Sequence, residues 1–329
     1  MQLDEFHYEL PKELIAQSAL TPKDSSRLMV LEEEKITHKH FYDILYYLKA
    51  GDTLVINEAK VSRAILKGKK ETGGVVELML TSVKDDLTYE CHIDSNVKVV
   101  GKKLVFSDEV SCVVLDKKDN VYIVKFNKAP DNQMLKLPTP PYIKQELKDE
   151  SQYQTIYSKK EGSLAAPTAG LHFTDELFEK IQKKGVKIAR LCLHVGFGTF
   201  LPVMDSIENH KMHQECFEVD KKNADIINNR KGRLIVVGTT SVRTLEATAN
   251  KDGKIVPQIG STEIFIYPGY KFKNNIDALI TNFHLPKSTL LMLVSAYYGR
   301  KNVLAAYIEA VKEKYRFFSL GDAMMMVKH

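Results

Sequence analysis

Polar residues that could bind a substrate follow three apolar runs of this 329-residue sequence. They occur in "LHVGFGTFLP", "VGTTSVRT" and "TNFHLP", which begin at Leu193, Val237 and Thr281. If each apolar run is a strand of an α/β sheet, these segments lie at the carboxyl ends of strands, where such sheets bind ligands. The groups expected to bind substrate there are His194, Gly196, Phe197, Gly198, Thr199, Thr239, Thr240, Arg243, Asn282, Phe283 and His284.

The segment "VGTTSVRT" has the composition of an anion site. Hydroxyls and unpaired N–H groups at the start of a helix bind anions or carboxylates. Arg243 follows about one helical turn after the two threonines, so it can reach the same ligand. The alternative is a well-capped helix with an arginine at the surface.

The glycine-rich segment that begins at Gly196 does not fit a dinucleotide loop. Such a loop runs directly into a helix, whereas Leu-Pro follows "GFGTF" here, and we therefore exclude NAD binding. A glycine turn that brings backbone close to a flat ligand, with Phe197 and Phe200 as stacking walls, fits better. A tight structural turn is the alternative.

The segment "HKMHQE" places His210, His213 and Glu215 close together in the sequence. Two histidines and a carboxylate can bind a metal, but these histidines lack the i, i+4 spacing of a metalloprotease helix. A histidine beside a carboxylate can also move protons near neutral pH. We therefore expect acid–base chemistry and no metal, with a solvated loop as the alternative.

A fourth segment, "GSLAAPTAGLHFT", begins at Gly162 and joins small residues to a histidine. Small side chains let backbone approach a ligand or another backbone closely. Thr174 is the expected N-cap of a helix over Asp175–Lys184. We expect Thr168 to contact substrate and His172 to take part in catalysis beside the three strand ends. A purely structural histidine is the alternative.

The elements that must position these residues fall into two domains. Between residues 62 and 130, short β-type runs alternate with turn-forming pairs, which is typical of a small barrel. Before and after this block, apolar runs such as "TLVIN" and "RLIVVG" alternate with helical segments, which favours a parallel sheet. We predict an α/β protein in which residues 1–61 and 151–329 form a larger domain with a mainly parallel open sheet. Residues 62–150 would form an inserted small β-barrel domain.

Composition and charge leave the partner open. A hydrophobic content of 44% and a charged content of 27% are ordinary for a globular protein. The net charge of +5 permits an RNA partner without requiring one. The four cysteines have no metal-binding spacing and resemble the reduced thiols of a cytosolic protein. No targeting segment or apolar run of membrane-spanning length is evident, so we expect a cytoplasmic protein without membrane contact.

Short motifs along nearly the whole chain resemble one family, the S-adenosylmethionine:tRNA ribosyltransferase-isomerases of queuosine biosynthesis. The matching runs are "YELPKELIAQ", "SSRLMVL", "GDTLVIN", "KKETGG", "LPTPPYI", "YQTIY", "GSLAAPTAGLHFT", "LHVGFGTFLPV", "HKMHQE", "GTTSVRTLEA", "TNFHLPKSTLLMLVSA" and "YRFFSLGDAM". The resemblance implies an α/β domain with an inserted β-barrel. It also implies transfer of the ribosyl part of S-adenosylmethionine onto the aminomethyl group of a deazaguanine at the tRNA wobble position. The sugar is rearranged to give epoxyqueuosine, and adenine and methionine are released.

The implied reaction needs a base. A sulfonium acidifies the C–H bonds beside it, and one of these protons must be removed. His213 or His172 is the expected base, with Glu215 orienting or supporting it and His210 in the same segment. An acid could assist the departure of adenine.

The implied substrates suggest binding roles. Phe197, Phe200 or Phe283 would face the sulfonium or stack on adenine. The threonines of "VGTTSVRT" and Arg243 would hold the methionine carboxylate. S-adenosylmethionine is then a consumed substrate, and no metal or redox cofactor is needed. We expect a monomer whose partners are S-adenosylmethionine and the anticodon loop of a tRNA, where bases can be splayed out.

Two regions depart from the family pattern. The family usually has Asp-Thr-Arg after Asn57 and an arginine at position 65, where this chain has "EAK" and Ile65, with Arg63 as a possible substitute. The family usually has an aromatic residue where Cys216 stands. Two other functions therefore stay open: a metal-dependent hydrolase built on "HKMHQE", and a tRNA-binding protein without catalysis.

Overall fold

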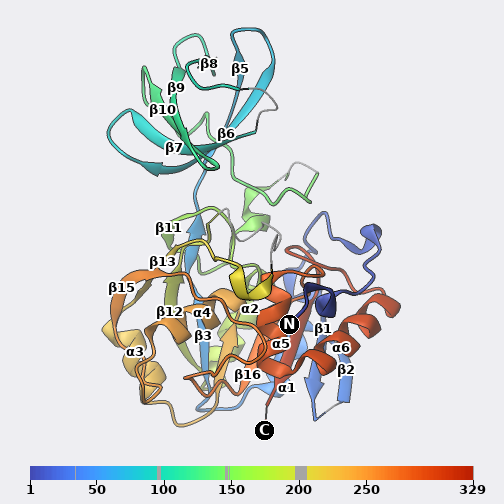
Figure 1. Ribbon diagram of the computed structural model, residues 1–329. Helices are drawn as coiled ribbons and strands as arrows, with labels where there is room; N and C mark the ends of the chain where they lie inside the picture. The colour runs from blue at the N-terminus through green and yellow to red at the C-terminus, as the bar shows by residue number, and fades with distance from the viewer. Residues whose placement is uncertain (34, 95–97, 145–146, 148, 197–205, 329) are drawn as a thin grey trace. The chain divides into compact units, whose positions relative to one another are not determined.

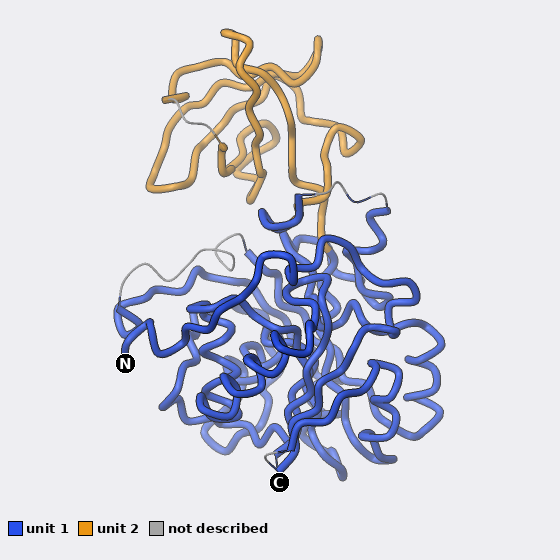
Figure 2. Tube along the Cα trace, turned by 90° about the vertical axis from the view of Figure 1, so that its right-hand side faces the viewer, with its two compact units in different colours: residues 1–60, 140–329 blue, residues 61–139 orange. Residues whose placement is uncertain are grey.

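The computed structural model of the chain describes residues 1–33, 35–94, 98–144, 147, 149–196 and 206–328. The chain divides into two compact units (Figure 2): unit 1 combines Met1–Lys60 with Pro140–His329, and unit 2 is Val61–Thr139. Unit 1 is thus built from two separate stretches of the chain. Within the described ranges, no helix is long and apolar enough to span a bilayer.

A nine-stranded sheet forms the centre of unit 1 (Figure 1). β12, β3, β14 and β16 are parallel neighbours, whereas β17 runs antiparallel to β16 and parallel to β1. The outer strands β13, β15 and β2 pair antiparallel. The predicted class, an α/β domain with an inserted barrel, is confirmed, and its open sheet has a parallel centre with antiparallel edges. The strand order is β15 (Gln258–Thr262), β13 (Glu215–Val219), β12 (Lys187–Leu193), β3 (Thr53–Asn57), β14 (Leu234–Val237), β16 (Ala278–Asn282), β17 (Ala323–Val327), β1 (Arg27–Glu32) and β2 (Lys35–His40).

Residues of each central strand alternate between two cores. Val236 packs into the core that holds Val242 and Leu245, whereas Val237 packs into the core that holds Leu177 and Phe178. Successive side chains of a strand point to opposite faces, so continuous apolar runs need cover on both. The first face is covered by α3 (Lys221–Asn228), α4 (Thr239–Thr248), α5 (Thr289–Tyr298) and α6 (Arg300–Lys312), and the second by α1 (Ile44–Tyr47) and α2 (Asp175–Lys183).

Local signals set the bounds of α2. The Thr174 hydroxyl oxygen accepts a hydrogen bond from the Leu177 N–H at 3.2 Å, as an N-cap does. Gly185 follows the helix with a φ of +87°, a conformation that favours glycine. The short elements of unit 1 are η1 (Leu3–Phe6), η2 (Lys12–Leu14), η3 (Lys23–Ser25), η4 (Phe41–Asp43), η5 (Glu150–Tyr153), η6 (Thr168–Gly170), η8 (Ile207–Asn209) and β11 (Lys160–Ser163), which pairs with β4 (Ala59–Val61).

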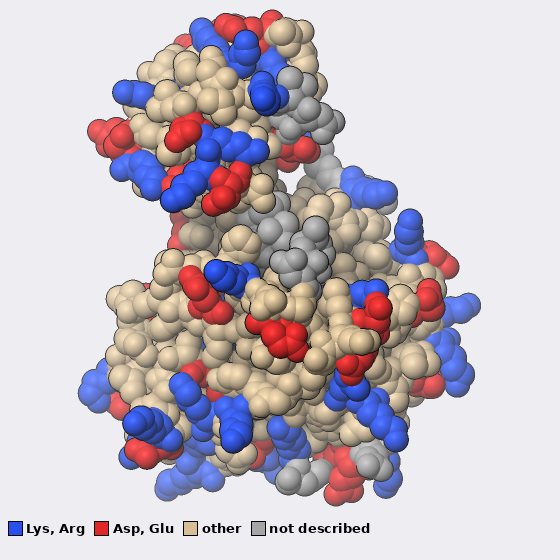
Figure 3. Space-filling model, viewed as in Figure 1, with Lys and Arg blue, Asp and Glu red and all other residues tan. Residues whose placement is uncertain are grey.

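Unit 2 is a closed antiparallel barrel around its own core. The strand order is β10 (Val121–Phe126), β7 (Thr88–Asp94), β6 (Val75–Val83), β5 (Ile65–Lys70), β8 (Lys103–Val105) and β9 (Ser111–Lys118). Closure gives every strand two partners and leaves no open edge. Charges of both signs are interspersed on the face shown in Figure 3. Within unit 2, Lys84 and Glu90 form an ion pair at 2.6 Å.

The segment that follows the barrel belongs to unit 1. The side-chain amide nitrogen of Gln17 donates a hydrogen bond to the Tyr142 backbone carbonyl at 3.0 Å. The side-chain oxygen of Gln17 accepts one from the Lys144 backbone N–H, also at 3.0 Å. The Tyr142 ring meets the Phe318 ring edge-on at 4.0 Å. The sequence-based division placed this segment, up to residue 150, with the barrel. The partners that hold it to unit 1 are remote in sequence.

Candidate functional site

Polar groups from several strands meet at one edge of the large sheet. β3, β12, β14 and β16 are parallel, so their carboxyl ends lie at the same edge. β17 is antiparallel to β16, with Ala323 opposite Asn282, and β1 is parallel to β17, so both begin at this edge. The edge therefore collects Asn57, the start of α4, Asn282 and Ser26, which precedes β1.

Asn57 ties three elements together at this edge. Its amide nitrogen donates to the Leu193 carbonyl at 3.0 Å and to the Thr240 hydroxyl at 3.2 Å. Its carbonyl oxygen accepts from the N–H groups of Leu193 and Ala59, both at 3.1 Å. Sequence reasoning did not select Asn57 as a site residue, although an asparagine at the end of an apolar run was the available signal.

The small-residue loop packs against the turn that opens α4. Gly238 is the N-cap of α4 and has a φ of +86°, and a Cβ there would lie 3.7 Å from the Cβ of Ala169. Thr168 and Thr240 are half-buried beside this turn, whereas Thr239 is buried. The structure thus brings three of the predicted substrate-binding threonines, Thr168, Thr239 and Thr240, into one region.

His172 is buried at the same edge. Its Nδ1 lies 2.7 Å from the Ser26 hydroxyl, and its ring stacks on Phe41 with centroids 4.9 Å apart. Burial lowers the pKa of His172 to about 4; the Asn282 side chain opposes this shift, and the positive charges of Arg316 and Lys23 add to it. The imidazole is therefore neutral at pH 7.

Four side chains of unit 1 carry buried polar atoms without a hydrogen-bond partner among the described residues, and two of them, Asn282 and Arg316, lie close enough to His172 to shift its pKa. We call His172, Asn282, Tyr153 and Arg316 the polar cluster. The His172 Nε2, Asn282 Oδ1, Tyr153 hydroxyl and Arg316 Nη1 are buried and have no hydrogen-bond partner among the described residues. Buried polar atoms are normally paired, so such a group is typical of a site that binds a polar ligand or water. Tyr153 and Arg316 were missed as site residues, although both lie in sequence motifs that carried the family resemblance, "YQTIY" and "YRFFSLGDAM".

Glu215 and Arg243 form a buried ion pair, with their side chains 2% and 4% exposed. The second Glu215 oxygen accepts from the Gly196 N–H at 3.0 Å, and the Arg243 Nε donates to the Ile264 carbonyl at 3.2 Å. Separating a buried ion pair costs free energy, because it leaves a buried charge without its partner. Arg243 Nη1 is paired with Glu215, whereas its buried Nη2 has no partner among the described residues. The expectation that Arg243 holds a substrate carboxylate therefore stays a prediction.

The two histidines of "HKMHQE" differ in exposure. His210 is half-buried with its ring edge-on to Phe265 at 5.3 Å, and His213 is exposed. Both Glu215 oxygens are used by Arg243 and Gly196. In the part of the chain that the structure describes, no three His, Cys, Asp or Glu side chains gather to hold a metal ion.

His194 is half-buried beside Gly162. A Cβ at Gly162 would come within 3.3 Å of the His194 ring, so glycine allows the two segments to approach. The Cys192 sulfur lies 3.5 Å from the His194 Nε2. Burial is the largest of the effects that lower the pKa of His194, followed by the charge of Lys160.

Two predicted ligand contacts belong to the core instead. Phe283 is fully buried among Tyr307, Tyr315 and Phe317 and cannot stack on a ligand. His284 is buried with its Nε2 3.0 Å from the Thr281 hydroxyl, and burial lowers its pKa to about 3. The aromatic residues that cover Phe283 come from later in the chain. The role expected for His284 stays a prediction. The remaining candidates, Phe197, Gly198 and Thr199, lie outside the described residues.

The fold and this edge define an α/β protein with an inserted barrel and a polar site at the carboxyl ends of its parallel strands. The chain belongs to the queuosine biosynthesis protein family, whose model matches residues 3–326. It is also similar to a crystal structure of an S-adenosylmethionine tRNA ribosyltransferase from Thermotoga maritima, at 38% identity and a TM-score of 0.56. That likeness covers 98% of this chain and 100% of the other. The resemblance inferred from short motifs is confirmed.

The loop glycine Gly170 gives a first prediction. A Cβ there would lie 2.1 Å from the Tyr157 hydroxyl and 2.9 Å from the Thr155 methyl carbon. We expect Gly170→Ala to lower the free energy of unfolding by about 2 kcal/mol through overpacking. Gly74→Ala is the control, since the nearest atom to its added Cβ is 3.7 Å away. Urea denaturation measures both, and equal stabilities would contradict the close approach.

The ion pair gives a second prediction. Glu215→Ala leaves Arg243 buried without its partner, and we expect a loss of about 3 kcal/mol in the free energy of unfolding. The double variant Glu215→Leu/Arg243→Met removes both charges and should lose clearly less. Denaturant midpoints of the wild-type chain and of these variants measure the losses in the free energy of unfolding. Additive losses would show that the two side chains do not interact.

The buried histidine gives a third prediction. An unfolded histidine takes up a proton below about pH 6.5, whereas folded His172 stays neutral down to about pH 4. The unfolded state binds more protons in this window, so stability falls as pH falls from 6.5 to 4. His172→Gln should remove roughly 3 kcal/mol of this dependence. The exposed His40→Gln is the control, and equal pH slopes in both variants would contradict a neutral His172.

Proposed function

We propose that this chain transfers and isomerises the ribosyl group of S-adenosylmethionine onto the aminomethyl-deazaguanine at the wobble position of tRNA. The products would be epoxyqueuosine-tRNA, adenine and methionine. Membership of the queuosine biosynthesis family and the likeness to a named S-adenosylmethionine tRNA ribosyltransferase support this proposal. S-adenosylmethionine is consumed as a substrate, no other cofactor takes part, and the chain acts as a monomer in the cytoplasm.

The observation that carries the proposal is buried, neutral His172 with a ring nitrogen that has no described partner. In the tautomer whose Nδ1–H donates to the Ser26 oxygen, Nε2 keeps a lone pair. That nitrogen then takes the proton from the carbon beside the sulfonium. His213 is exposed, so its surroundings offer no desolvated site for this step. His172 is therefore the preferred base, and Glu215 acts indirectly by holding Gly196.

The departures from the family pattern do not argue for a decayed enzyme. Ile65 is 6% exposed, its N–H donates to the Lys136 carbonyl at 3.0 Å, and it pairs with Met79 in the barrel. An isoleucine there fills a structural position of β5. The polar cluster lies in unit 1, apart in sequence from the departures at residues 58–65. These facts favour catalysis over the tRNA-binding alternative.

A turnover assay tests the proposal. The purified chain is mixed with S-adenosylmethionine and an anticodon stem-loop that carries the aminomethyl-deazaguanine. Mass spectrometry should find equal release of adenine and methionine with a matching mass gain on the RNA. Binding of the RNA without adenine release would leave a binding protein and overturn the proposal.

Variants assign the base. Loss of a general base slows catalysis by about 10²- to 10⁴-fold, and we expect this range for His172→Gln. His7→Asn is the control, because the His7 ring is exposed and its Nε2 lies 2.8 Å from the carboxylate of Glu9. His213→Ala separates the two candidates. A large loss in His213→Ala with activity kept in His172→Gln would move the base to His213.

A further inference from the structure

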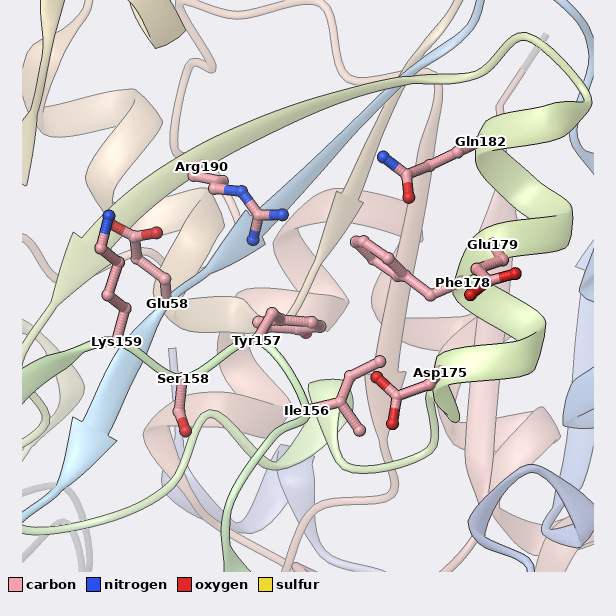
Figure 4. A pocket seen from close by; sticks show the side chains of 10 residues that line it. All are labelled: Glu58, Ile156, Tyr157, Ser158, Lys159, Asp175, Phe178, Glu179, Gln182 and Arg190. Atoms are coloured by element: carbon pink, nitrogen blue, oxygen red, sulfur yellow. The ribbon is translucent and has the colours of Figure 1, made fainter.

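A pocket of about 540 Å³ lies beside α2, on the face of the sheet that α2 covers (Figure 4). Its volume falls within the range of sites for small molecules. Neither the sequence analysis nor the proposed mechanism uses it. The lining side chains are Glu58, Ile156, Tyr157, Ser158, Lys159, Asp175, Phe178, Glu179, Gln182 and Arg190.

Arg190 supplies an unpaired cation to this pocket. It lies in β12 at the position opposite Ile56, and its backbone N–H donates to the Asn223 side chain at 2.7 Å. Its guanidinium carbon is 5.9 Å from the centroid of the Phe178 ring. The guanidinium makes no hydrogen bond or ion pair with any described residue, although the side chain is only partly exposed. A planar guanidinium of this kind matches a carboxylate.

The other walls are acidic and aromatic. Asp175 and Glu179 stand one turn apart on α2 and line the pocket together with Glu58 from beyond β3 (Figure 4). The lining carries three carboxylates and two cations, Lys159 and Arg190. Two of the carboxylates have further cations beside them: Glu179 pairs with Lys183 at 3.3 Å, and Glu58 lies 3.9 Å from Lys160. Tyr157 and Phe178 add ring faces between the charges (Figure 4). A ligand with one carboxylate, more than one positive charge and an apolar stem fits this lining.

We propose that this pocket binds the amino-acid end of S-adenosylmethionine and, after the reaction, methionine. The inference rests on the proposed function. The ligand carboxylate binds Arg190, and the ammonium group faces the carboxylate of Asp175. The sulfonium lies against the ring faces of Tyr157 and Phe178, as cations do on aromatic side chains. Arg190 would then take the carboxylate-binding role that the sequence analysis expected of Arg243, which is buried and paired with Glu215.

One loop connects the pocket to His172. Asp175 lines the pocket and is three residues from His172, which limits their Cα separation to about 11 Å. On the other side of His172, Gly170 lies directly under the Tyr157 hydroxyl. The pocket and the proposed base therefore share the segment Gly170–Asp175.

The test measures recognition of the ligand carboxylate. Arg190→Ala should raise KM for S-adenosylmethionine by about 10- to 100-fold, the range expected for a lost charge-assisted hydrogen bond, and leave KM for the RNA stem-loop unchanged. Arg190→Lys should recover part of this loss. Arg230→Ala is the matched control, since Arg230 lies in unit 1 outside the lining and donates to the Ile227 carbonyl.

Decarboxylated S-adenosylmethionine isolates the contact. The wild-type chain should bind it more weakly than S-adenosylmethionine, and Arg190→Ala should bind the two equally, by calorimetry without RNA. Persistence of the wild-type preference in Arg190→Ala would overturn the inference, even if turnover is intact. Arg190-dependent binding without turnover would support the pocket and count against the proposed reaction. Thermal melts of each variant confirm that it is folded.

Discussion

The hydrogen bonds of the Asn57 side chain are the constraint on which the site depends. A buried amide must satisfy its donors and acceptor, and Asn57 does so with Leu193 in β12, Thr240 in α4 and the N–H of Ala59. These bonds set the register of two central strands and the start of a helix at one point. The chain leaves unit 1 for the barrel a few residues later. The inserted barrel is therefore joined to unit 1 close to the hydrogen bonds of Asn57.

Two arginines on opposite faces of the sheet show how burial decides the use of a charge. Arg243 faces the core under α4 and is neutralised by Glu215, so its charge serves to hold Gly196 and the strand ends. Arg190 faces α2, keeps access to a pocket and has no described counter-ion. A charge that is fully paired supports the structure, whereas one that is half-buried and unpaired is available to a ligand.

The strands and the site edge could be predicted because buried parallel strands are continuous apolar runs, as in "TLVIN" and "RLIVVG". The partners of individual polar and aromatic side chains could not be predicted. The partner of Arg243 is 28 residues away, and the aromatic cover of Phe283 comes from Tyr307, Tyr315 and Phe317. Arg190 interrupts an apolar strand, and that local signal was overlooked. Pairing across the fold, rather than residue type, decides which of these groups meet a ligand.

The small residues of the loop from Gly162 to Thr174 serve contacts on several sides. Gly162 allows the approach of His194, Ala169 packs against Gly238, and Gly170 lies against the Tyr157 hydroxyl. Larger side chains at these positions would push the loop away from the sheet edge. His172 would then lose its bond to Ser26 and its burial, which together keep the imidazole neutral and oriented. The close packing of the loop is therefore a condition for the proposed chemistry at His172.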